Sequence, residues 1–122
     1  MTTAGGRIAE LDLAWAAGFL EGEGSFMLWQ GRPRLKVSQV DREPLERLKR
    51  LFDGTICEDG GPRRKQDNPR RQTMWYWSLT GERARAVMLA VQPFMSDRRK
   101  AQIAHALSAQ PNRDAPESGD ER

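Results

Sequence analysis

The chain has 122 residues, which is enough for one compact domain with a modest hydrophobic core. Its formal net charge at pH 7 is +3. Residues 1–110 carry 18 basic and 13 acidic side chains, whereas residues 111–122 carry 2 and 4, so the two parts have charges of +5 and −2. The basic part suits a polyanionic partner. Cys57 is the only cysteine, which excludes an intrachain disulfide and a cysteine-based zinc site and favours a reducing compartment.

Both ends of the chain are too polar to join a core, and we expect residues 1–7 and 108–122 to be disordered around a domain over residues 8–107. The longest uncharged apolar run is Leu13 to Leu20, far shorter than the roughly 20 residues that span a bilayer. We therefore expect a soluble, intracellular protein without a membrane partner.

Helix and strand signals alternate along this domain. The expected elements are a helix over 8–22, a hairpin of strands 25–30 and 33–40 with its turn at residues 31–33, a helix over 41–54, strands 55–59 and 73–79, and helices 81–91 and 96–108. The side chains of Asp41, Thr80 and Ser96 are expected to cap the helices that follow them.

This order predicts an α+β fold, an αββαββα domain in which helices cover one face of an antiparallel four-stranded sheet. Alternation directs one set of strand side chains to the helices: Phe26, Leu28, Leu35, Val37, Trp75, Trp77 and Leu79. The other set lies on the open face: Ser25, Met27, Trp29, Arg34, Lys36, Ser38, Met74, Tyr76 and Ser78. Cations at alternate positions among aromatic residues are typical of a surface that enters a DNA groove. Alternatively, Arg34 and Lys36 only keep the open face soluble.

The segment between the last two strands, "GGPRRKQDNPRR" at 60–71, has a single acidic residue and five basic ones: Arg63, Arg64, Lys65, Arg70 and Arg71. Such a loop predicts salt-sensitive contacts with phosphates. The alternative is a solvated basic loop without a role.

The first helix has no polar side between Leu13 and Leu20, and a helix that is apolar all round is buried all round. One sheet covers only one side of it. The small residues Ala14 and Gly18 would let a second helix approach closely, and the natural partner is a twofold-related copy. The expected dimer interface comprises Leu13, Ala14, Ala17, Gly18 and Glu21.

Glu21 and Glu23 lie at the C-terminus of this helix, where the helix dipole already contributes about half a negative charge. A divalent cation would relieve that repulsion, and hard oxygen ligands beside a basic surface suggest Mg²⁺ held between carboxylates and phosphate. The alternative is that both glutamates are solvated residues of a helix-to-strand turn.

The segment "LAWAAGFLEGEGSF", residues 13–26, resembles the signature of the LAGLIDADG homing endonucleases. The segments "VSQVD", "YWSLTGERA" and "VQPFMSDRRKAQ" continue the likeness in order and spacing, so that it covers about residues 11–107. The resemblance implies a site-specific endonuclease that hydrolyses double-stranded DNA with Mg²⁺ or Mn²⁺. It also implies a homodimer that acts on a long pseudo-palindromic site, in the service of intron or intein mobility.

The resemblance also implies roles for particular residues. Glu23 and the backbone carbonyl of Gly22 would bind the metal, and Glu21 would have a structural role. Gln39 would orient the attacking water, and Arg98 or Lys100 would lie near the scissile phosphate. DNA contacts would come from Arg32, from the basic residues of 60–71 and from Ser25, Met27, Trp29, Arg34, Lys36, Ser38, Tyr76 and Ser78. The rival readings are a non-cleaving DNA or RNA binder of the same fold, in transcription or intron splicing, and a structural homodimer without nucleic acid.

Overall fold

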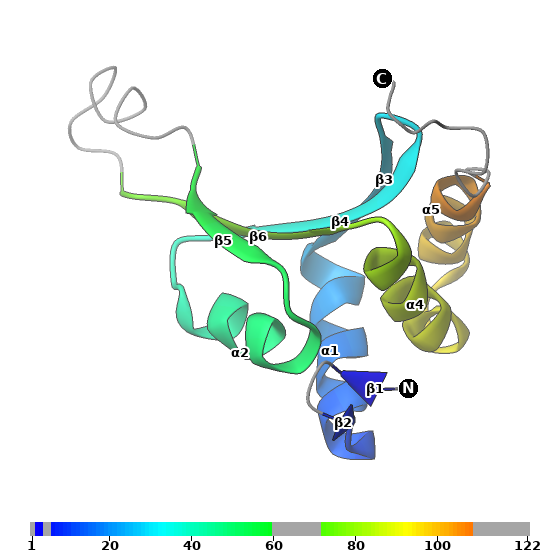
Figure 1. The fold of residues 1–122 in the computed structure, drawn as a ribbon, viewed down its shortest axis with the longest axis horizontal. Helices are drawn as coiled ribbons and strands as arrows, with labels where there is room; N and C mark the ends of the chain where they lie inside the picture. The colour runs from blue at the N-terminus through cyan, green and yellow to red at the C-terminus, as the bar shows by residue number, and fades with distance from the viewer. Residues whose placement is uncertain (1, 4–5, 60–71, 109–122) are drawn as a thin grey trace.

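A curved four-stranded antiparallel sheet organises the protein in the computed structural model, which describes residues 2–3, 6–59 and 72–108 (Figure 1). The strands follow the order β3-β4-β6-β5: β3 is Gly24–Trp29, β4 is Arg32–Gln39, β6 is Trp75–Thr80 and β5 is Thr55–Glu58. The helices are α1 (Glu10–Glu23), α2 (Glu43–Phe52), α4 (Glu82–Val91) and α5 (Asp97–Leu107), and a 3-10 turn, η1 (Gln92–Phe94), joins the last two. The predicted α+β fold class is confirmed.

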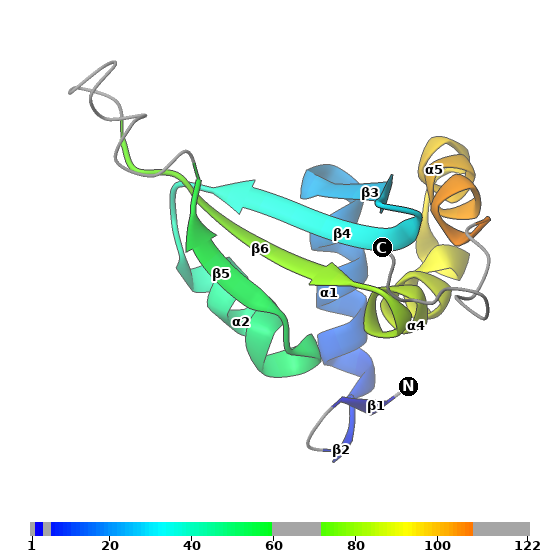
Figure 2. The same ribbon diagram turned by 45° about the horizontal axis from the view of Figure 1, so that its top comes forward.

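The four α-helices among the described residues lie on the same side of this sheet (Figure 1). Figure 1 shows α1, α2 and α4 beneath the curved strands and α5 beside β3, and the turned view in Figure 2 leaves the opposite face uncovered. The shared face is buried, whereas the open face presents side chains from every strand. The fold therefore provides a concave surface above the helix layer.

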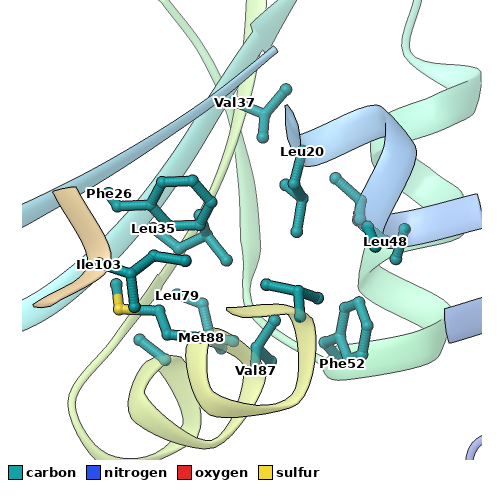
Figure 3. Packing of buried hydrophobic residues seen from close by; sticks show 14 of the residues in the cluster. Leu20, Phe26, Leu35, Val37, Leu48, Phe52, Leu79, Val87, Met88 and Ile103 are labelled. Carbon is teal, nitrogen blue, oxygen red and sulfur yellow. The ribbon is translucent and has the colours of Figure 1, made fainter. Parts of the chain in front are cut away.

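The core lies between this sheet and the helices, as Figure 3 shows for Leu20 of α1, Leu35 of β4, Met88 of α4 and Ile103 of α5. Five of the seven strand residues expected to face inward are buried: Phe26, Leu35, Val37, Trp77 and Leu79. Leu28 and Trp75 are only half-buried, because Leu28 lies next to the hairpin turn and Trp75 is the first residue of β6.

Several element boundaries differ from the predicted ones. The hairpin turn is at Gln30 and Gly31, which both have positive φ, so β4 already begins at Arg32, opposite Trp29. The first helix begins at Glu10 and continues through Gly22 to Glu23. Residues 2–3 and 6–7 form the short antiparallel pair β1–β2 in a segment predicted to be disordered. So short a pair rests on backbone pairing, for which apolar patterning gives no signal.

Of the three predicted helix caps, the one at Ser96 is confirmed, whereas Asp41 lies one residue before Arg42, the N-cap of α2. The Asp41 side chain accepts a hydrogen bond from the Glu43 N–H at 2.9 Å, and the Ser96 hydroxyl accepts one from the Arg99 N–H at 3.3 Å. The prediction for Thr80 is wrong, because Thr80 remains in β6 opposite Arg34 and the N-cap of α4 is Gly81 without a side-chain hydrogen bond.

The turn between α2 and β5 depends on Gly54, which has φ +102°. A Cβ there would lie 2.6 Å from Trp77 Nε1 and 2.7 Å from the Ser78 carbonyl oxygen. That indole nitrogen already donates to the Asp53 carbonyl at 2.7 Å, so it has little room to move.

Gly54→Ala is therefore expected to lower the free energy of unfolding by about 3 kcal/mol or more, since backbone strain and a steric clash add. Gly31→Ala is the matched control, because Gly31 has φ +75° with nothing within 4 Å of an added Cβ. This control should cost only about 1–2 kcal/mol from the backbone. Urea unfolding of both variants measures the difference, and equal losses would contradict a steric role for Gly54.

Candidate functional site

The end of α1 brings two predicted site residues together. Glu23 is the last residue of α1, and the chain passes directly into β3, with the Gly24 N–H donating to the Leu20 carbonyl. Gln39 is the last residue of β4, and its Nε2 donates a hydrogen bond to Glu23 Oε1 at 2.9 Å. Glu23 is exposed and Gln39 half-buried. A carboxylate and an amide thus form a pair that solvent and ligands can reach.

Glu21 is held differently from Glu23. Its two carboxylate oxygens accept hydrogen bonds from the backbone N–H and the hydroxyl of Ser96, each at 2.8 Å. The N–H bond is the largest cause that lowers the pKa of Glu21, followed by the hydroxyl bond, and the charges of Arg99 and Arg98 act in the same direction. Desolvation opposes them more weakly than they act together. Glu21 therefore links α1 to the N-terminus of α5, while Glu23 keeps its exposed position.

Arg99 completes this junction, although it was not among the predicted site residues. Its side chain is buried, with 8% of the residue exposed. Nε donates to the Glu21 carbonyl oxygen at 2.9 Å and Nη1 to Gln102 Oε1 at 2.8 Å. The neighbours predicted to act at the scissile phosphate, Arg98 and Lys100, are both exposed at the start of α5. Arg98 also contributes to the electrostatic environment of Glu21, which places its charge near the end of α1.

Within residues 2–3, 6–59 and 72–108, no group of three His, Cys, Asp or Glu side chains is arranged to hold an ion. The predicted ligands at the end of α1 are the Glu23 carboxylate and the Gly22 carbonyl. Mg²⁺ is commonly bound by one or two carboxylates together with substrate phosphates and water, so these two groups fit one part of such a site.

The strand register aligns the side chains of the open face in rows across the sheet. Ser25, Lys36, Ser78 and Thr55 lie side by side across the four strands. Ser38, Tyr76 and Cys57 form a neighbouring row, and Met27 lies opposite Arg34. The predicted open-face side chains of the paired strands therefore share one face.

Cations on this face pack against aromatic rings. The Arg34 guanidinium carbon is 4.6 Å from the centre of the Trp29 ring, and Lys36 Nζ is 4.5 Å from that of Tyr76. Stacking holds these charges over rings while Trp29 remains 42% exposed. Arg32, opposite Trp29 in the hairpin, is exposed. The surface therefore offers both positive charge and flat apolar groups.

The open face also contains an acidic side chain, Asp59, which was not among the predicted site residues. Asp59 follows β5 and accepts a hydrogen bond from Ser38 Oγ at 3.4 Å. The pKa of Tyr76 is raised, first by a hydrogen bond with Cys57, then by desolvation. The predicted basic residues Arg63, Arg64, Lys65, Arg70 and Arg71 lie outside the described residues.

An exposed stripe runs along α1 on the side away from the core. Leu11 is 84% exposed, and Ala14, Gly18 and Gly22 follow it at helical spacing, all exposed. An added Cβ at Gly18 or Gly22 would meet nothing within 4 Å. Of the predicted interface residues, Ala14 and Gly18 lie in this stripe, Leu13 and Glu21 are half-buried, and Ala17 belongs to the chain's own core.

None of the described helices combines the length and the apolar character that a membrane span requires.

Two crystal structures of the homing endonuclease I-CvuI share this fold. The structure with the I-CreI target and 2 mM Mg, in which the DNA is not cleaved, aligns with a TM-score of 0.61 at 18% identity over 81% of this chain and 65% of that chain. The structure with the enzyme's own target and 2 mM Ca gives a TM-score of 0.56 at 18% identity over 80% and 64%.

Sequence comparison adds no relative to these structural neighbours, since neither a protein-family profile nor a curated protein matches the chain. The chain spans just under two thirds of the length of the two aligned I-CvuI chains. The fold is that of a homing endonuclease. This result confirms the predicted architecture.

Proposed function

We propose that this chain is a site-specific endonuclease of double-stranded DNA that requires a divalent metal, Mg²⁺ or Mn²⁺, and acts as a homodimer. The observation that carries the proposal is the hydrogen bond between Glu23 and Gln39 at the end of α1. Along the chain this pair adjoins two residues of the open cationic face, since Ser25 is two residues from Glu23 and Ser38 is next to Gln39. The I-CvuI structures, whose chains are bound to DNA targets, support the same reading of the open face.

The chemistry divides among a few groups. A metal bound by Glu23 and the Gly22 carbonyl would lower the pKa of a bound water and neutralise phosphate charge. Gln39 uses one amide N–H on Glu23, which leaves its second N–H and its carbonyl oxygen to orient a water. Arg98, exposed near the same helix end, would stabilise negative charge on the phosphate. No nucleophilic side chain is required.

A second copy of the chain completes this proposed site. Each chain supplies one Glu23, and the exposed stripe of Leu11, Ala14, Gly18 and Gly22 leads along α1 to that residue. Pairing of two stripes would bury them and bring two Glu23 carboxylates to the centre of a long pseudo-palindromic DNA site. Cleavage of such sites would serve the mobility of an intron or intein.

A non-cleaving DNA or RNA binder of the same fold is the second candidate. It would use the open face equally well, and the pairs of Arg34 with Trp29 and Lys36 with Tyr76 suit it. Binding alone, however, gives no reason to hold a carboxylate and an amide together at the exposed end of α1. The Glu23–Gln39 pair therefore favours the nuclease.

Cleavage of a randomised DNA library tests the proposal. The full chain is incubated with the library in Mg²⁺, in Mn²⁺ and in EDTA, and cut ends are sequenced. We expect double-strand cuts at one class of long, partly palindromic sites in either metal and none in EDTA. Selective retention of DNA or RNA without any cut would support the binder instead.

Removal of the open-face cations should change how DNA affinity depends on salt. Arg34→Gln with Lys36→Gln is expected to lower duplex affinity and to reduce the slope of log K against log [salt] by about 2, since each phosphate contact contributes about 0.9. The control, Lys49→Gln with Arg50→Gln, removes the same charge from exposed positions on α2. Fluorescence anisotropy at several salt concentrations measures both slopes. Equal slopes in the two double variants would reject the open face as the DNA surface.

A further inference from the structure

The last turn of α1 is fastened to the start of α5 by three side chains, Glu21, Ser96 and Arg99. The Glu21 carboxylate accepts two hydrogen bonds from Ser96, and the Glu21 carbonyl accepts one from Arg99. The Ser96 hydroxyl also accepts the Arg99 N–H, so each of the three residues contacts the other two. We call this cluster the α1–α5 clamp.

We infer that Arg99, through the α1–α5 clamp, is a positioning residue that fixes the last turn of α1 and thereby holds Glu23 against Gln39. This inference rests on the proposed function for its catalytic meaning. Glu23 is only two residues beyond Glu21 and is the final residue of the helix. The position of the Glu23 backbone therefore depends on the contacts that fix the last turn of α1.

The terminal turn of a helix is its least constrained part, because its last carbonyls have no intrahelical partner. In α1 the Leu20 carbonyl accepts the Gly24 N–H, whereas the Glu21 carbonyl is satisfied by the guanidinium of Arg99. The two bonds from Ser96 approach the same turn through the Glu21 side chain. Contacts through both backbone and side chain oppose rotation as well as displacement of the turn.

The choice of arginine at this position is informative. Arg99 is on the buried face of α5 with Ile103 and Ala106, where an apolar side chain would pack without a desolvation cost. Its hydrogen-bond acceptors, the Glu21 carbonyl and Gln102, are neutral. A buried charge contributes little to stability, but in some proteins it specifies a single arrangement of the surrounding elements. The α1–α5 clamp fits this role in conformational specificity.

Arg99→Met tests the inference, because methionine keeps an unbranched buried chain and removes every donor. The first readout is the side-chain amide resonance of Gln39 in ¹H–¹⁵N spectra of the full chain, assigned by its loss in Gln39→Ala. We expect it to shift in Arg99→Met and to return part of the way in Arg99→Lys, because the lysine ammonium keeps a charged donor group at this position. Arg83→Met is the matched control and should leave the resonance in place. Arg83 forms an ion pair with Asp53, with 2.6 Å between Nη1 and Oδ2, and neither residue belongs to the clamp.

The second readout is kinetic. Arg99→Met is expected to lower the single-turnover cleavage rate about 10- to 100-fold and to raise the Mg²⁺ concentration for half-maximal rate, as loss of an outer-shell partner does. Duplex affinity measured without divalent metal should change less than about twofold, since Arg99 is buried away from the open face.

The outcomes separate this inference from the proposed function. An unmoved Gln39 resonance in Arg99→Met overturns the inference whether or not the protein cleaves DNA. Absence of cleavage by the wild type overturns the proposed function, and the resonance then decides the inference alone. If Arg99→Met does not fold, Glu21→Gln provides the same readout, because its amide group replaces one of the two acceptors for Ser96.

Discussion

Glu23→Gln is expected to abolish Mg²⁺-dependent cleavage, with a rate loss of at least about 10³-fold, or about 4 kcal/mol of transition-state stabilisation. Glutamine has the size of glutamate but lacks the negative charge that attracts a divalent cation. It can still pair with Gln39, so the variant separates charge from shape. DNA binding in EDTA should be unchanged or tighter, because a negative charge beside phosphate has been removed.

Glu10→Gln is the control for this variant, since it makes the same change at the exposed opposite end of α1. Cleavage is measured in a single turnover on a site recovered from the library, with binding measured separately on the same duplex. Full cleavage by Glu23→Gln would remove Glu23 from the proposed mechanism. A loss of cleavage caused by a matching loss of binding would assign Glu23 to the DNA surface instead.

The open face of the sheet could be predicted from the sequence, because strand alternation is a local pattern. Alternation along β4 directs Lys36 and Ser38 to the open face and Val37 and Gln39 to the helix side. A strand that starts directly after a helix brings the helix end to the sheet. These patterns do not predict the contact between Glu23 and Gln39, which are 16 positions apart, and only the resemblance to the homing endonucleases singled out the two residues.

Arg99 shows where such prediction stops. Three basic residues in a row, Arg98, Arg99 and Lys100, look alike in composition, and charged residues are expected at the surface. The signal was the helical spacing of Arg99 with Ile103 and Ala106, which places all three on the buried face of α5. The capping prediction for Thr80 is wrong for a related reason. Threonine is a good capping residue, but Thr80 is paired with Arg34 as the last residue of β6.

The exposed side of α1 leads to the second large effect. A helix without a polar side was expected to be covered on all sides, and in one chain Leu11, Ala14, Gly18 and Gly22 are exposed. Gly18 is within the helix, where glycine costs about 1 kcal/mol relative to alanine or leucine. Since an added Cβ at Gly18 meets no atom of the described residues within 4 Å, contacts within the described part of the chain do not explain the lack of a side chain there. Close approach of a second helix in the proposed homodimer would explain it.

Gly18→Leu is therefore expected to have opposite effects on the chain and on the dimer. Stability of the isolated chain should rise by up to about 1 kcal/mol through helix propensity. The dimer should weaken at least about 100-fold, or about 2.7 kcal/mol, because the added side chain separates the two backbones. Ala104→Leu enlarges an exposed position on α5 and should leave the dimer unchanged. Sedimentation velocity over a range of concentrations and urea unfolding at low concentration measure the two effects. A wild-type chain that stays monomeric at micromolar concentration, or a Gly18→Leu dimer of undiminished affinity, would exclude pairing through this stripe.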